Sequence, residues 1–171
     1  VRMGQPLPRA PSGHSRRCAQ LCVDAAVVLG MDVDTTRILR QAALVHEWGT
    51  TAIPNSIWDK PGSLTRAEFD RVELHPMLTE QMLRRSPGLA ALNGVAAAHH
   101  ERSDGSGYHR RLAADAVDPS AGVLVAADVY VGLTTDRADR PAYTTDHAAA
   151  ELDRLVTAGV LQPEATQAVL T

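Results

Sequence analysis

Apolar residues recur at steps of three and four along most of this chain, which is the spacing of one face of an α-helix. The pattern is clear over residues 18–29, 38–45 and 121–131. No useful length of sequence alternates apolar and polar residues, so no significant sheet is expected. Aromatic residues make up only 4% of the chain, which favours helices packed closely on small side chains. The chain is therefore predicted to be an all-α bundle of six or seven helices.

Capping residues indicate where some of these helices begin. Asp34 is expected to cap the second helix and Thr145 to cap a helix near the C-terminus. Thr65 with Glu68 three residues later has the pattern of a capping box, which predicts a third helix after a proline-containing loop. A final short helix is expected to begin near Pro163.

Length and composition are those of one ordinary domain. The 171 residues are 44% apolar and 22% charged, with a formal net charge of −3. A chain of this size buries roughly 70% of its unfolded surface, so any metal site would serve function rather than stability. Residues 1–12 are expected to be an irregular lead-in and residues 13–171 one helical domain. Because the chain starts at Val1, we expect a fragment of a larger regulatory protein.

Composition also argues against several partners and compartments. Seventeen Lys and Arg against twenty Asp and Glu leave no basic excess for direct binding of nucleic acid. No apolar stretch approaches the roughly 18 residues of a membrane helix, so no membrane association is expected. Cys18 and Cys22, one helical turn apart, fit a reducing compartment and are expected to pack as small apolar groups, a metal site being the weaker interpretation. The domain is predicted to be cytoplasmic.

Several polar residues fall on helix faces that the apolar spacing assigns to the interior. An isolated buried carboxylate costs several kcal/mol, and an unpartnered imidazole costs about 1–3 kcal/mol. Any one of these histidines alone is better explained as a core residue with a hydrogen-bond partner. Together they favour a metal site, because helical bundles build such sites from imidazoles and carboxylates on facing helices. The inward polar residues are His46, His75, His99, His100 and Asp128.

The neighbours of these residues suggest two ions rather than one. Consecutive residues on a helix project about 100° apart, so His99 and His100 can address two ions side by side. Glu47 directly follows His46 and supplies a carboxylate of the kind that bridges two ions.

Three motifs in this sequence closely resemble the HD-GYP branch of the HD metal-dependent phosphohydrolase superfamily. They are HHERSDGSGY at 99–108, AADVYVGLTTDRADR at 126–140 and IPNSIWDKPGSLT at 53–65. The resemblance extends from about His14 to the C-terminus and implies an HD-domain-like helical bundle. It places the family's metal ligands on the five inward polar residues, with Glu47 at the second position of the HD signature.

The resemblance also implies an activity. Relatives bind two or three iron or manganese ions and hydrolyse the phosphodiester of cyclic di-GMP or a related cyclic dinucleotide. Two ions would lower the pKa of a bridging water and clamp the phosphate, with Glu47 and Asp128 as the catalytic carboxylates. The substrate-binding residues implied are Lys60, Tyr108, Arg137 and Arg140, although the lysine and the arginines also suit a solvated surface.

Four positions depart from the family pattern and weaken the catalytic interpretation. Glu47 replaces the usual aspartate, Thr50 replaces a lysine, and His109 replaces the proline of the GYP signature. Ala10 stands where a glutamate holds the third ion in trinuclear relatives, which leaves His14 as an accessory ligand and favours a centre of two ions.

Three hypotheses follow. The domain is an active or slowed phosphodiesterase, or a weakened or inactive sensor domain, for example of a helix-turn-helix transcription regulator. The third is a purely structural helical module. A homodimer and a fused sensor or output domain are compatible with each of them.

Overall fold

The computed structural model describes residues 12–136 and 140–171. Seven of its α-helices span seven residues or more, and the expectation of an all-α domain is confirmed. In the described ranges β pairing is limited to isolated bridges, such as the one between Asp104 and Ala113. The helices are α1 (His14–Val28), α2 (Val33–Val45), α3 (Asn55–Trp58), α4 (Arg66–Val72), α5 (His75–Arg84), α6 (Asn93–Ala96), α7 (Pro119–Leu133), α8 (Thr145–Thr157) and α9 (Pro163–Leu170). Three 3-10 helices, η1 (Trp48–Ala52), η2 (Pro87–Leu92) and η3 (Ala114–Ala116), complete the structure.

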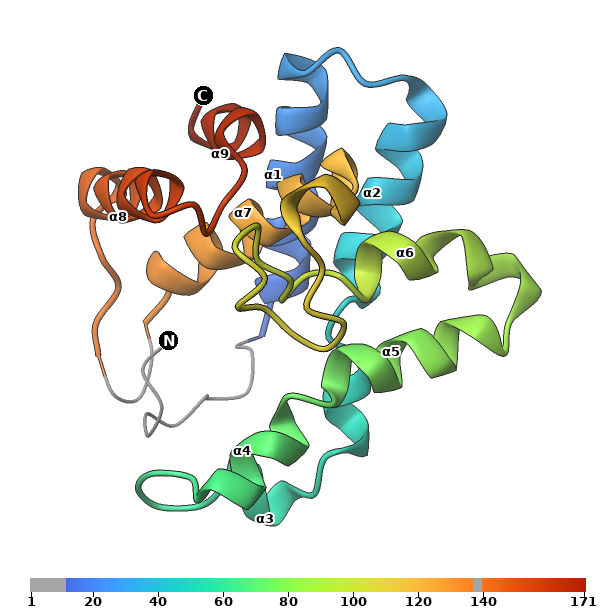
Figure 1. Cartoon of the computed structure of the whole chain (residues 1–171), viewed down its shortest axis with the longest axis vertical. Helices are drawn as coiled ribbons and strands as arrows, with labels where there is room; N and C mark the ends of the chain where they lie inside the picture. The colour runs from blue at the N-terminus through green and yellow to red at the C-terminus, as the bar shows by residue number, and fades with distance from the viewer. Residues whose placement is uncertain (1–11, 137–139) are drawn as a thin grey trace.

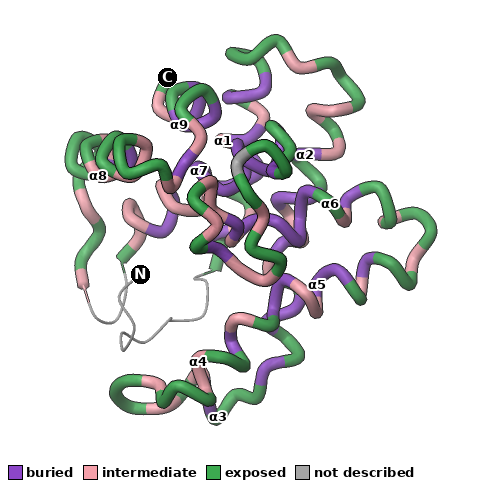
Figure 2. Tube along the Cα trace, viewed as in Figure 1, coloured by how far each residue is buried: buried purple, intermediate pink, exposed green. Residues whose placement is uncertain are grey.

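Helix α7 is the centre of the bundle. It packs against α1, α2, α6, α8 and α9 (Figure 1). Its side chains are buried over most of its length, whereas the outer side of α8 and the α3–α4 end are largely exposed (Figure 2). The main core consists of small and branched side chains such as Cys22, Ala42, Leu39 and Leu124. Close helix packing on small residues, as the composition predicts, is therefore what surrounds α7.

The local signals for helix ends are partly correct. The capping box of Thr65 and Glu68 is present at the start of α4, and α9 begins at Pro163. Two predicted caps are wrong by one or two residues. Asp32, not Asp34, accepts the first amides of α2, and Thr144, not Thr145, caps α8. In each case two capping residues lie close together, and the one with extended backbone geometry is the cap.

The segment from Leu89 to His99 is not one regular helix. Pro87–Leu92 forms a 3-10 helix, α6 covers only Asn93–Ala96, and turns follow to His100. Leu92 at the end of the 3-10 helix, and Val95 and Ala96 in α6, are nevertheless all buried in the core. No helix in the described ranges has both the length and the apolar character that crossing a membrane requires.

Candidate metal centre

The inward polar residues come from five separate parts of the bundle. His14 is the first residue of α1, His46 ends α2, and His75 is the first residue of α5. His99 and His100 follow α6. Asp128 lies within α7, and Glu47 lies between α2 and η1. Several helix ends therefore meet beside the central helix α7. The sequence pattern predicted which residues face the interior, but not how they are arranged in space.

Three of the imidazoles are held in the same way. The Nδ1 atoms of His46, His75 and His99 each lie 2.7 Å from a backbone carbonyl oxygen three residues earlier in the chain. A carbonyl only accepts hydrogen bonds, so Nδ1 carries the proton in each ring. The Nε2 atom of each ring is then the nitrogen that faces the site. This orientation by an outer hydrogen bond is typical of histidines that bind metal ions.

The donor atoms form two neighbouring groups, each with all its atoms within 4.8 Å of one another. The first group is His14, Cys18, His46 and Asp128. The second group is Glu47, His75, His99 and His100.

Short distances connect the donors within and between these groups. His14 Nε2 lies 2.9 Å from Asp128 Oδ1, and His46 Nε2 lies 3.8 Å from the same oxygen. Glu47 lies between the groups, with Oε1 3.8 Å from His46 Nε2 and Oε2 3.9 Å from His75 Nε2. Its position is that of a carboxylate able to contact ions in both groups.

Two observations show that these residues fit cations. His75 Nε2 and His99 Nε2 are 3.0 Å apart, and the Nδ1 proton of each ring is already directed at a carbonyl oxygen. Two acceptors at that distance repel each other unless a proton or a metal ion lies between them. In addition, His46 Nε2 is fully buried and has no hydrogen-bond partner among the described residues. Such orphaned buried atoms are expensive, and a coordinated ion removes the cost.

The pKa shifts of His99, His100 and Asp128 favour the protonation states that bind metal ions. Burial, together with the neighbouring imidazoles, lowers the pKa of His99 and that of His100 well below the usual value. Burial alone would raise the pKa of Asp128, but the hydrogen bond from His14 and the nearby His46 and His100 hold it well below its usual value. Neutral imidazole and ionised carboxylate are the forms that bind metal ions, and both are favoured here at neutral pH.

His46 behaves differently from the other two histidines. Its burial lowers its pKa, but the adjacent carboxylates of Asp128 and Glu47 outweigh burial and raise it.

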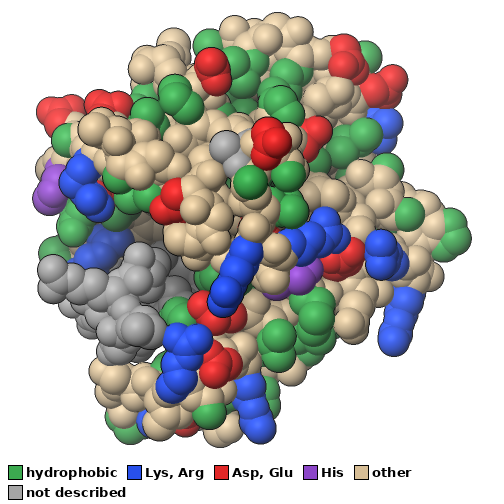
Figure 3. Space-filling view, in the orientation of Figure 1, with side chains coloured by type: hydrophobic (Ala, Val, Ile, Leu, Met, Phe, Trp, Pro, Cys, Tyr) green, Lys and Arg blue, Asp and Glu red, His purple; other side chains and the backbone are tan. Residues whose placement is uncertain are grey.

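The histidines contribute only small areas to the face drawn in the space-filling view (Figure 3), in keeping with the burial of His46 and His99.

The residues implied for substrate binding lie in different surroundings. The Tyr108 ring is 4.8 Å from that of His100 and 6.3 Å from that of His75, centroid to centroid. Tyr108 therefore lies beside the metal-binding residues. Lys60 Nζ is instead 2.6 Å from Glu68 Oε2, within the capping box of α4. Arg137 lies outside the described residues.

Arg140 makes structural contacts at the end of α7. Its guanidinium donates hydrogen bonds to the carbonyls of Gly132 and Leu133 and lies 4.6 Å from the centre of the Tyr143 ring. These contacts satisfy carbonyls at a helix C-terminus. A role of Arg140 in substrate binding stays a prediction.

Sequence reasoning missed three residues that contribute to the site. Gly49 donates its amide to Thr79 Oγ1, and Thr79 donates its hydroxyl to the His46 carbonyl, which joins α5 to the end of α2. Glu101 is almost fully buried and accepts the backbone amides of Arg110 and Leu112, so it holds the loop that carries Tyr108. No spacing signal marks these residues.

Cys18 packs in the main core, as the sequence analysis expected, and it also lies in the first donor group, which was the weaker interpretation. Its position four residues after His14, on the same helix face, was the available signal.

Similarity to known proteins covers most of this chain. The family model described as HD domain matches residues 7–158. The chain belongs to the HD domain family. With the motifs at 99–108 and 126–140, it is an HD-GYP domain of that metal-dependent superfamily.

Two relatives and one solved structure illustrate the similarity. The chain is 37% identical over 143 residues to 3'3'-cGAMP-specific phosphodiesterase 3 of Vibrio cholerae, covering 83% of this chain and 31% of the relative. It is also 37% identical over 143 residues to the cyclic di-GMP phosphodiesterase response regulator RpfG of Xanthomonas campestris pv. campestris, covering 82% and 38%. An HDG"Y"P protein from Bdellovibrio bacteriovorus has the same fold, with a TM-score of 0.72 at 20% identity over 93% of this chain and 51% of that one. The HD-GYP domain spans about a third of the length of the two curated relatives.

Proposed function

We propose that this HD-GYP domain is a metal-dependent phosphodiesterase that hydrolyses a cyclic dinucleotide such as cyclic di-GMP. The observation that carries the proposal is the pair of adjoining donor groups with Glu47 between them. The names of the two relatives support the substrate class, since one is a cyclic GMP-AMP phosphodiesterase and the other a cyclic di-GMP phosphodiesterase.

Two divalent ions, iron or manganese, are proposed for the centre. Bound ions would lower the pKa of a water and neutralise charge on the phosphodiester. The residues of the chain would hold the two ions and keep the ligands in place. Asp128 and Glu47 are proposed as the carboxylates that hold the two ions, and the carbonyl bonds to Nδ1 hold His46, His75 and His99 in their ligating orientation. Tyr108 is proposed to contact the substrate beside His100.

Elemental analysis coupled to a hydrolysis assay tests the proposal. Protein purified without chelator is expected to hold about two equivalents of iron or manganese and to linearise cyclic di-GMP or cyclic GMP-AMP. The double variant His99→Ala, Asp128→Ala is expected to lose both metal and turnover. His147→Ala is the matched control, because His147 is exposed on α8 and stacks on Tyr143 away from the donor groups. Absence of metal from the unaltered protein would sink the proposal.

One observation favours a second function, a sensor domain that binds a cyclic dinucleotide without hydrolysing it. Thr50 is buried and donates its hydroxyl to the Glu47 carbonyl, so this position brings no cation to the centre. Calorimetric titration of the metal-loaded protein with cyclic di-GMP, followed by analysis of the recovered nucleotide, distinguishes the two functions. Binding with intact nucleotide after long incubation would indicate a sensor.

A further inference from the structure

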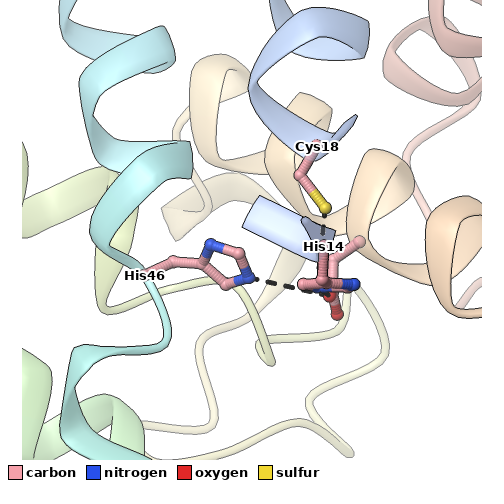
Figure 4. A group of neighbouring side chains, drawn as sticks. His14, Cys18 and His46 are labelled. Carbon is pink, nitrogen blue, oxygen red and sulfur yellow. Dashed lines mark hydrogen bonds and ion pairs between the residues drawn. The ribbon is translucent and has the colours of Figure 1, made fainter. Parts of the chain in front are cut away.

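The group of His14, Cys18, His46 and Asp128 contains a sulfur atom that the proposed centre does not yet use. Cys18 lies one helical turn after His14 on α1, and its Sγ lies 3.5 Å from His14 Nε2. Figure 4 shows the sulfur pointing down toward the His14 ring, with the His46 ring pointing toward the same group from the left of the view. The thiol is therefore directed at the same place as the imidazoles.

Burial alone does not explain this placement. Cys22 is on the same face of α1, one turn further on, and both cysteines are fully buried in the main core. Only the Cys18 sulfur lies within 4.8 Å of the three other donors. The orphaned Nε2 of His46 is a second and independent sign of a missing ligand at this position, because it is fully buried, faces the group and has no hydrogen-bond partner in the described ranges.

The distances suit a small coordination shell. Around a tetrahedral zinc ion, bond lengths of about 2.0–2.3 Å place neighbouring donors roughly 3.3–3.8 Å apart. The separations from Cys18 Sγ to His14 Nε2 and from His46 Nε2 to Asp128 Oδ1 are 3.5 and 3.8 Å. His14 Nε2 donates a hydrogen bond to Asp128 Oδ1 at 2.9 Å, so coordination through Nε2 requires that the ring proton move to Nδ1 and that the two atoms separate by a few tenths of an ångström. Two imidazoles, one thiolate and one carboxylate are ligand types that zinc accepts in a four-coordinate site.

We propose that Cys18 is a metal ligand, and that its sulfur makes this position of the centre select zinc or ferrous iron over manganese. The inference rests on the proposed metal centre and adds the ligand that determines which ion it takes. Sulfur is a soft donor, preferred by zinc and iron, whereas manganese prefers oxygen donors. Coordination replaces the S–H bond of Cys18 by a sulfur–metal bond, and the thiol proton passes to solvent.

Cys18 must lose its thiol proton to bind a metal ion, and its surroundings oppose this loss until a cation is bound. Burial and the nearby Asp128 carboxylate raise the pKa of Cys18 above its ordinary value. A bound divalent cation reverses that electrostatic balance and deprotonates a coordinating thiol outright. Without an ion, Cys18 is therefore an inert buried thiol, and with an ion it becomes a ligand.

Cobalt substitution tests the proposal directly. The whole chain is stripped with chelator and titrated anaerobically with Co²⁺, and the thiolate-to-cobalt charge-transfer absorption is recorded. The band is expected in the unaltered protein and in Cys22→Ser, the matched control, and is expected to be absent from Cys18→Ser. Zinc affinity of Cys18→Ser is expected to fall at least about tenfold, since even outer-shell changes cost 10–100-fold, while manganese affinity stays unchanged. Bound cobalt without the band in the unaltered protein, or an equal band in Cys18→Ser, would overturn the proposal.

A second measurement needs no variant and covers the case in which Cys18→Ser does not fold. X-ray absorption of the zinc-loaded protein is expected to show sulfur at about 2.3 Å from zinc, and nitrogen or oxygen scatterers alone, at about 2.0–2.2 Å, contradict the proposal. Failure of the inference and failure of the proposed function are separable. Hydrolysis of cyclic dinucleotide without any sulfur signal overturns only the inference, whereas a sulfur signal without hydrolysis overturns only the phosphodiesterase.

Discussion

At the scale of single residues, some donor atoms of the centre lack a suitable partner unless a cation is present. The Nε2 atoms of His75 and His99 lie 3.0 Å apart, and His46 Nε2 is buried without a hydrogen-bond partner among the described residues. Each is a cost to the folded state that the unfolded chain does not carry, because water satisfies the same atoms there. Metal binding and folding are therefore expected to be coupled.

The first prediction concerns metal removal. Chelation is expected to lower the Tm by about 5–10 °C, because an ion present at a hundred times its Kd adds about 2.7 kcal/mol and each kcal/mol shifts a domain of this size by roughly 2–4 °C. Calorimetric scans with and without chelator measure the shift. In His99→Ala the chelator is expected to have little effect. If chelator leaves the Tm of the unaltered, metal-containing protein unchanged, metal binding at the donor groups does not stabilise the fold.

The second prediction concerns pH. The folded-state pKa values of His99 and His100 are depressed, so below about pH 6.5 the unfolded chain binds protons that the folded protein excludes. Stability rises with pH wherever the unfolded state binds more protons, so it is lost as pH falls through that window. The raised pKa of His46 acts in the opposite direction, but it is one group against two.

Urea unfolding of the chelated protein at pH 7.5, 6.5 and 5.5 measures this effect. The free energy of unfolding is expected to decrease at each step down in pH. The decrease is expected to be smaller in the double variant His99→Ala, His100→Ala, which lacks both depressed imidazoles. A flat profile in the unaltered protein would show that neither group excludes protons in the folded state.

At the scale of elements, the end of α2 and the start of α5 are locked together. The Gly49 amide donates to Thr79, whose hydroxyl donates to the His46 carbonyl. The backbone approach is so close that a Cβ on Gly49 would lie 1.9 Å from the His75 carbonyl oxygen. This contact sets the distance between the two helices that carry His46 and His75.

The third prediction follows from that contact. Gly49→Ala is expected to destabilise the protein by about 1–3 kcal/mol, the usual cost of overpacking, and to lower metal affinity because α5 must move away from α2. Gly94→Ala in α6 is the matched control, since no atom lies within 4 Å of its added Cβ. It is expected to leave stability unchanged or to raise it by up to about 1 kcal/mol. Denaturant unfolding and zinc titration of both variants check the result, and equal behaviour of the two would contradict the packing argument.

The elements also show which parts of the fold could be predicted from the sequence. The apolar spacing predicts α1, α2 and α7 because these helices bury one wide face or nearly their whole surface. Between Leu89 and His99 it identifies the buried positions correctly but not the helix type, because a 3-10 helix precedes the short α6 there. Cap positions fail by a residue or two at α2 and α8, because backbone geometry decides between neighbouring capping residues.

At the scale of the whole molecule, the candidate site is a junction of segments far apart in sequence. His14 and Asp128 are 114 residues apart, and Arg17 on α1 also donates hydrogen bonds to Thr134 and Thr135 beyond α7. The set of inward residues could be predicted because burial of an unpartnered polar group is costly anywhere. Their division into two groups, and the inclusion of Cys18, depend on how helices pack, which residue spacing does not record.

The fourth prediction uses this junction. Because the donors come from α1, α2, α5, α7 and the turn after α6, bound metal is expected to slow local opening in all of these elements together. Helix α8 contributes no donor and packs on α7 and α9 at the edge of the bundle (Figure 1), so its local opening is expected to change little. Hydrogen exchange followed by mass spectrometry, with and without metal, resolves the elements separately. The slowing is expected to disappear in His99→Ala and to persist in His147→Ala, whose altered residue lies on α8 itself. Protection confined to one helix would mean that the ion binds locally and does not join the segments of the bundle. Protection across the five segments, with α8 unchanged, would show that the metal centre holds the core helices as one unit.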